Sequence, residues 1–90
     1  MEFDWDSKKA EANLKKHGVS FQEGATVFGD PLALTFDDPD HSINERRFLT
    51  FGTTRTGRLA IVSHTEHDGI TRIISARLMK KHERKIYEEG

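Results

Sequence analysis

The chain contains no cysteine, and this absence removes whole classes of chemistry. Disulfide bridges, cysteine nucleophiles and thiolate metal sites are all excluded. The sequence also lacks any run approaching the ~20 apolar residues that a membrane-spanning helix needs. Its opening stretch, MEFDWDSKK, is acidic and carries no apolar signal-peptide segment, so we expect a cytoplasmic protein with no membrane partner.

Apolar residues are scarce as well. They make up 34% of the 90 residues, and charged residues make up 32%. This length predicts one domain over residues 1–90 that folds alone. Because the apolar fraction is small, we expect a partner or ligand to cover part of the surface.

A strong net charge is also absent, but the formal value of -1 hides an asymmetry. Residues 1–45 carry four lysines and ten acidic residues, a net of -6, whereas residues 46–90 carry ten basic and five acidic residues, a net of +5. Six of the fourteen basic residues lie in the last nineteen positions. The pattern indicates either a basic functional face or two halves that attract each other.

The first third of the chain predicts two helices. The segment DSKKAEANLKKHG predicts the first helix: Asp6 or Ser7 can cap its start, and Gly18 is well placed to end it. A second helix follows at SFQE, which reads as a capping box: Ser20 caps the helix and Glu23 reaches back to its start. The GDP tripeptide then stops this helix.

The rest of the chain predicts a sheet and a last helix. Strands are expected over residues 32–36, 46–52, 58–65 and 70–76, and a helix from about 78 to 89. Short turns between the last three strands favour an antiparallel meander. The predicted order is ααββββα. This is an α+β fold with two N-terminal helices, a four-stranded antiparallel sheet and a C-terminal helix, with the helices packed on one sheet face.

The predicted C-terminal helix has two different edges. Met79, His82 and Ile86 share a stripe that is expected to pack on the sheet. The other edge is basic and ends in an aromatic residue. Its stripe consists of Lys80, Arg84 and Tyr87, and Lys81 and Lys85 lie nearby.

Two arginines of the fourth strand lead into this helix. Regular strand alternation places Arg72 and Arg77 on opposite faces, unless the strand–helix junction re-aims Arg77. Arginine forks pair with phosphate oxygens, and metal-free cleavage of RNA through its 2′-hydroxyl needs the developing phosphate charge stabilised. Tyr87 is suited to stacking on an unpaired base. A solvated basic helix face, or a docking face for an acidic partner, explains the same residues.

Three blocks of the sequence resemble a known family over about residues 3–89. They are DWDSKKAEANLKKHGVSFQEGATVFGDP, DPDHSINERR and RIISARLMKKHERKIYEE, and together they look like the BrnT toxins of type II toxin–antitoxin systems. The resemblance implies a single RelE-like domain and a metal-independent ribonuclease that arrests translation. The RNA substrate's scissile phosphate would then be surrounded by the catalytic candidates Arg72, Arg77, Arg84 and Tyr87.

The same resemblance implies a partner. BrnT toxins pair with a BrnA antitoxin that carries a ribbon-helix-helix DNA-binding domain, and the complex represses its own operon. Operator DNA would therefore be reached only through the antitoxin. A second hypothesis keeps this partner and drops the chemistry: a non-catalytic binding module for operon autoregulation. A third is a metal-dependent nuclease.

Two histidines complete the candidate RNA contacts, together with Lys80 and Lys81. His17 lies in the last turn of the first helix, where it contacts RNA or the antitoxin, or serves as a structural residue beside Gly18. His64 lies in the third strand. A half-buried histidine with satisfied nitrogens is the default there, and a proton-transfer role beside the arginines is the alternative.

The segment DDPDH groups three aspartates with His41 in a loop. Carboxylate oxygens suit Mg²⁺, but the spacing matches no metal-ligand motif, and Asp and Pro are ordinary turn residues. We therefore predict no metal site and no cofactor. We expect instead that the loop hydrogen-bonds to Arg46 or Arg47.

Overall fold

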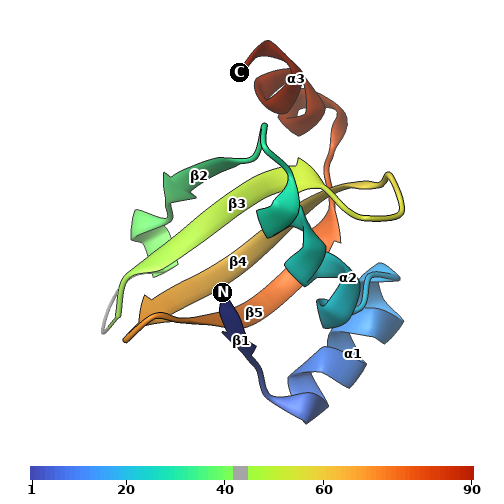
Figure 1. Cartoon of the computed structure of the whole chain (residues 1–90). Coiled ribbons are helices and arrows are strands. Elements are labelled where there is room, and N and C mark those ends of the chain that lie inside the picture. The colour runs from blue at the N-terminus through green and yellow to red at the C-terminus, as the bar shows by residue number, and fades with distance from the viewer. Residues whose placement is uncertain (42–44) are drawn as a thin grey trace.

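A mixed sheet of five strands organises the computed structural model, which describes residues 1–41 and 45–90 (Figure 1). The strands are β1 (Glu2–Asp4), β2 (Leu34–Asp37), β3 (Arg47–Thr53), β4 (Leu59–His67) and β5 (Ile70–Leu78). Their order across the sheet is β1-β5-β4-β3-β2. β1 runs parallel to β5, and the other neighbours are antiparallel.

The helices lie on both faces of this sheet, so the prediction that they pack on one face is wrong. One face is covered by α1 (Ser7–His17), α2 (Phe21–Ala25) and the 3₁₀ turn η1 (Thr26–Gly29) (Figure 1). The other face carries α3 (Lys81–Glu89) near one end, and a second 3₁₀ turn, η2 (Pro39–His41), connects toward β3. Within the described residues, no helix is both long and apolar enough to cross a membrane.

The mixed α+β class is as predicted, but the expected order ααββββα and the four-stranded antiparallel sheet are wrong. β1 precedes the helices and adds a fifth, parallel strand at the edge of the sheet. Three residues are too few to display a strand period in sequence. Phe3 packs its ring 5.4 Å from that of Phe28, and Asp4 pairs with Arg72. Long-range contacts therefore define β1.

The predicted start and end of the first helix are confirmed. The Asp6 carboxylate accepts hydrogen bonds from the backbone N–H groups of Lys8 and Lys9, at 2.8 and 3.1 Å. Gly18 adopts a left-handed conformation with φ 70°, which favours glycine, and closes the helix. Within α1, Asn13 is buried and clamps β5: its amide donates to the Ala76 carbonyl and accepts from the Ala76 N–H.

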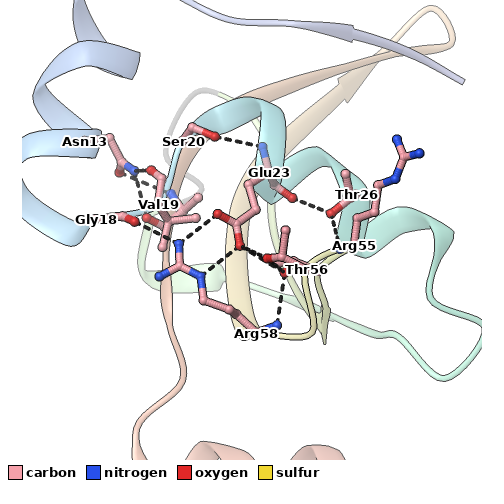
Figure 2. A network of polar contacts seen from close by, with 11 residues as sticks. Asn13, Gly18, Val19, Ser20, Glu23, Thr26, Arg55, Thr56 and Arg58 are labelled. Carbon is pink, nitrogen blue, oxygen red and sulfur yellow. Dashed lines mark hydrogen bonds and ion pairs between the residues drawn. The ribbon is translucent and has the colours of Figure 1, made fainter.

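The second helix follows the prediction at only one of its two capping residues. The Ser20 hydroxyl accepts from the Glu23 N–H at 2.9 Å, as expected. The Glu23 carboxylate does not reach back, however. It accepts two hydrogen bonds from Arg58, at 2.8 and 2.9 Å, and others from Thr54 and Thr56 in the β3–β4 hairpin (Figure 2). These hydrogen bonds, led by those from Arg58, lower the pKa of Glu23 to about 2.

Two apolar clusters fill the two sides of the sheet. The larger lies under α1, α2 and η1 and consists of Val19, Phe21, Val27, Ala60, Val62, Ile73 and Ala76. The smaller lies on the opposite face and consists of Phe51, Ile61 and Met79, with Tyr87 packed against it. The larger cluster forms the hydrophobic core between the sheet and the helices α1 and α2. The smaller one leaves much of the other face open beyond α3.

The orientation of α3 differs from the predicted one. Met79 is buried, but His82 is exposed and Ile86 is 44% exposed. Glu83 and Tyr87 turn inward instead. A polar anchor fixes this orientation, because the Glu83 carboxylate is held by Arg77. The apolar stripe in the sequence therefore predicted the wrong face of the helix to pack on the sheet.

Candidate functional site

A β-bulge brings the two candidate arginines of β5 onto one face of the sheet. The register between β4 and β5 shifts by one residue, which leaves Ile74 as an extra residue in β5. Arg72 pairs with Thr65 and Arg77 pairs with Ile61. These β4 positions are four residues apart, so both arginines project from the same face, roughly 13 Å apart along the strands. The expected opposite faces required a regular strand, and the bulge between the two arginines breaks that condition.

The face that carries these arginines is hollowed into a groove of about 300 Å³. It lies opposite α1 and α2. Ser63 and Ser75 face each other in register across its floor. The described lining residues are Asp38, His41, Arg47, Leu49, Ser63, Ile74, Ser75 and Arg77. Hydroxyls, two guanidinium groups and an imidazole thus meet on one open surface.

Arg77 is fixed at the junction between β5 and α3. Its two terminal nitrogens donate to the two carboxylate oxygens of Glu83, both at 2.8 Å. The same carboxylate accepts from the Lys80 N–H at 2.8 Å and so caps α3. The hydrogen bonds from Arg77 hold the pKa of Glu83 at about 2, and the pKa of Arg77 is raised in turn. A planar, positively charged fork is therefore positioned at the edge of the groove.

Arg72 and Arg47 lie at the other end of this face. Thr65 pairs with Arg47 on one side and with Arg72 on the other, so the three residues form one row across the sheet. Arg72 also pairs with Asp4 at 2.5 Å, where both side chains are partly exposed. Arg47 was not among the predicted site residues. Strand alternation with Leu49 was the available signal, because it places both side chains on one face.

The loop before β3 behaves as predicted in one respect. Arg46 donates to the Asp37 carboxylate at 3.0 to 3.2 Å, which confirms the expected contact between the acidic loop and an arginine. Asp38 and His41 turn toward the groove instead. Across residues 1–41 and 45–90, no three acidic or histidine side chains converge as ligands for a metal ion.

The remaining basic candidates on α3 lie apart from this groove. Arg84 lines a second depression, of about 370 Å³, together with Arg58 and Met79. Lys80 and Lys81 are exposed at the start of α3. These three residues extend the basic surface around the end of β5 without entering the groove.

Tyr87 has a different environment from the one predicted. Its hydroxyl donates to the Asp30 carboxylate at 2.5 Å and lies 2.9 Å from the Thr53 hydroxyl. The bond to Asp30 raises the pKa of Tyr87. Burial acts to raise the pKa of Asp30, but the hydrogen bonds from Tyr87 and the Thr53 N–H lower it overall. This arrangement ties α3 to the end of β3.

The two candidate histidines lie on the helix-covered side. His64 is only 2% exposed, with Nε2 2.7 Å from the Thr50 hydroxyl and Nδ1 2.6 Å from the Glu66 carboxylate. Burial lowers its pKa, although Glu66 opposes this effect. Its burial conflicts with the expectation that it contacts RNA directly. His17 is half-buried at the end of α1, and neither histidine lines the groove.

Comparisons with known proteins identify one family by sequence and one solved structure with a similar fold. The family model described as the ribonuclease toxin BrnT of type II toxin–antitoxin systems matches residues 5–83. The fold is similar to the 1.1 Å crystal structure of the Brucella abortus ribonuclease toxin BrnT, with a TM-score of 0.65 and 20% sequence identity. That similarity covers 90% of this chain and 99% of the Brucella chain. Among curated proteins, none matches the sequence.

Proposed function

Because this chain belongs to the BrnT family of ribonuclease toxins of type II toxin–antitoxin systems, we propose that it cleaves RNA without a metal ion and thereby arrests translation. The observation that supports this most is the open sheet face on which a β-bulge gathers Arg72 and Arg77 beside Arg47. Arginine forks bind phosphate oxygens in a bidentate manner and stabilise the charge that develops during phosphoryl transfer.

RNA supplies its own nucleophile in this reaction. The 2′-oxygen attacks the adjacent phosphorus, the bond to the 5′-oxygen breaks, and the products are a 2′,3′-cyclic phosphate and a 5′-hydroxyl. Arg77 would hold the scissile phosphate at the groove, and Arg72 and Arg47 would hold the neighbouring backbone. Arg84, Lys80 and Lys81 would extend this contact along the strand, which predicts binding that weakens steeply with salt.

Tyr87 would have a structural role and would not take part in the chemistry. Its hydroxyl is engaged with Asp30 and Thr53, so its main role is to hold α3, and with it the Glu83 partner of Arg77. The same surface would serve regulation. A BrnA-type antitoxin with a ribbon-helix-helix domain would cover the groove, compete with RNA in the cytoplasm and link the toxin to operator DNA. RNA cleavage by the saturated complex at the rate of the free toxin would contradict this masking.

A second candidate function rests on a specific observation. Arg77 and Arg72 are both paired with carboxylates, so part of their charge is already balanced within the chain. A non-catalytic module that uses this face only to seat the antitoxin would need no free arginine. Such a protein would bind the antitoxin tightly and leave RNA intact.

The decisive experiment incubates the purified chain with total RNA in EDTA, beside Arg77→Ala and Arg77→Lys. We expect cleavage by the wild type and a loss of about 100-fold or more in both variants, because lysine keeps the charge but lacks the fork. Arg55→Ala is the matched control: Arg55 lies at the tip of the β3–β4 hairpin and its side chain points away from the Glu23 network (Figure 2).

Thermal melting of each variant separates a lost site from a lost fold. Arg77→Ala leaves the Glu83 carboxylate without its ion-pair partner, so the melting temperature of this variant is expected to fall. Arg77→Lys retains a cation for that carboxylate. A substrate with a 2′-deoxy nucleotide at the cleaved position should resist the wild type. Intact RNA after incubation with wild-type protein, together with tight antitoxin binding, would favour the binding module.

A further inference from the structure

One side chain on the rim of the groove is able to accept a proton and has no role yet in the proposed function. His41 lies at the end of η2, and its Nδ1 is 3.0 Å from a carboxylate oxygen of Asp38. The imidazole is exposed, at 65%, whereas the Asp38 side chain is 15% exposed. Both line the groove that Arg77 enters. The pair therefore combines an accessible base with a sheltered carboxylate.

The backbone holds this pair in place. The Asp38 N–H donates to the Arg47 carbonyl at 2.9 Å, which ties the turn to the first residue of β3. The His41 N–H donates to the Asp38 carbonyl at 3.3 Å and closes the turn. His41 is thus positioned relative to the strand that carries Arg47.

The carboxylate also determines which nitrogen can act. A carboxylate that accepts from Nδ1–H fixes the neutral tautomer in which Nε2 carries a lone pair. Asp38 would have this effect on His41, leaving Nε2 to accept a proton from a bound group. The same logic of a base oriented by a third group recurs in enzymes that activate a hydroxyl.

Three other residues that could act as a base, His64, Glu83 and Tyr87, are held in contacts away from the reacting position. Both nitrogens of His64 are occupied in the core, and the Glu83 carboxylate is bound to Arg77 and the Lys80 N–H. The Tyr87 hydroxyl is bound at the end of β3. Among the described residues that line the groove, His41 is the only imidazole.

We propose that His41 is the general base of the cleavage reaction and that Asp38 is its positioning residue; this rests on the ribonuclease function proposed above. His41 Nε2 takes the proton of the 2′-hydroxyl as the 2′-oxygen bonds to phosphorus. The bond from phosphorus to the 5′-oxygen breaks, and that oxygen takes a proton from water. The imidazolium then returns its proton to solvent, so the reaction needs no further reactant.

The test compares His41→Ala with His67→Ala on RNA that the wild type cleaves. His67 is a matched control, since it pairs with Asp68 at 3.2 Å, is 89% exposed and does not line the groove. General-base catalysis contributes about 10²- to 10⁴-fold, so His41→Ala should lose at least about 100-fold while His67→Ala stays active. Added imidazole should restore much of the lost rate, which a structural role would not permit.

Asp38→Asn supplies a separate readout. We expect kcat to fall with KM little changed, and imidazole to give no rescue, because the histidine is present but misoriented. Wild-type rates in His41→Ala, or an inactive His41→Ala that imidazole does not rescue, would overturn this inference. The ribonuclease proposal would stand in either case if Arg77→Lys is inactive. Intact RNA with the wild type would instead overturn the ribonuclease proposal itself.

Discussion

Arg77 and Glu83 join β5 to α3 through two parallel hydrogen bonds of 2.8 Å. The pair has two consequences. It holds a guanidinium at the groove, and it sets the rotation of the C-terminal helix, since Glu83 also caps the helix by accepting from the Lys80 N–H. The geometry of the candidate site and the docking of α3 are therefore coupled through one carboxylate.

Replacing Glu83 by glutamine should lower the free energy of unfolding by about 1–2 kcal/mol. The substitution removes a charged hydrogen-bond acceptor that is 11% exposed, and its partner Arg77 is partly screened by solvent at 32% exposure. Urea denaturation at neutral pH measures the loss. Glu88→Gln on the exposed side of α3 is the control and should change stability by less than about 0.5 kcal/mol. Equal effects of the two substitutions would show that the ion pair contributes nothing to α3 docking.

Acid should destabilise the protein through Glu23 and Glu83. Both carboxyls have their pKa lowered from 4.5 to about 2 by arginine hydrogen bonds. Because the folded pKa is the lower one, the stabilisation is complete above about pH 4.5 and is lost as the pH falls toward about 2. The Glu83 pair contributes on the order of 1 kcal/mol after allowance for solvent screening.

Urea denaturation at a series of pH values tests this directly. In Glu23→Gln, stability at neutral pH should be lower, and the decline between about pH 5 and pH 2 should be shallower than in the wild type, because one of the two titrating groups is gone. A variant with the same acid slope as the wild type would rule out Glu23 as a source of the pH dependence.

Much of the architecture followed from short-range signals. Asp6, Ser20 and Gly18 mark helix ends through local hydrogen bonds and backbone conformation, and the strands of the meander alternate or end at turns. These features depend on residues that are close together in the chain, so they can be recognised in the sequence. β1 does not: it forms because Phe3 reaches Phe28 and because the strand adds to the free edge of β5.

The site was harder to predict because it depends on register and on long-range ion pairs. No local sequence pattern predicts the bulge at Ile74. This bulge nevertheless places Arg72 and Arg77 on the same face of the sheet. Helical periodicity put Ile86 in the interface of α3, whereas the Arg77–Glu83 pair turns that side chain outward. At α3, the ion pair between neighbouring elements overrode the apolar pattern.

The close approach of α2 to the sheet predicts a strong effect at Gly24. A Cβ there would lie 2.9 Å from the Ala76 Cβ and 3.4 Å from a Val62 methyl, so Gly24→Ala must push α2 away from β5. We expect a loss of about 1–3 kcal/mol, seen as a drop of several degrees in the melting temperature. Gly29→Ala has open space around its Cβ and should melt close to the wild type. A Gly24→Ala protein as stable as Gly29→Ala would mean that this contact relaxes freely.

Tyr87→Phe separates an anchoring hydroxyl from a catalytic one. The substitution keeps the ring in the apolar cluster with Met79 but removes the hydroxyl bound to Asp30 and Thr53. We expect a loss of about 1 kcal/mol in stability, because Asp30 still accepts from the Thr53 N–H at 2.8 Å. RNA cleavage should stay within a few-fold of the wild type, since α3 remains docked and Arg77 remains paired. A loss of about 100-fold in cleavage without a change in melting temperature would instead assign the Tyr87 hydroxyl to the chemistry.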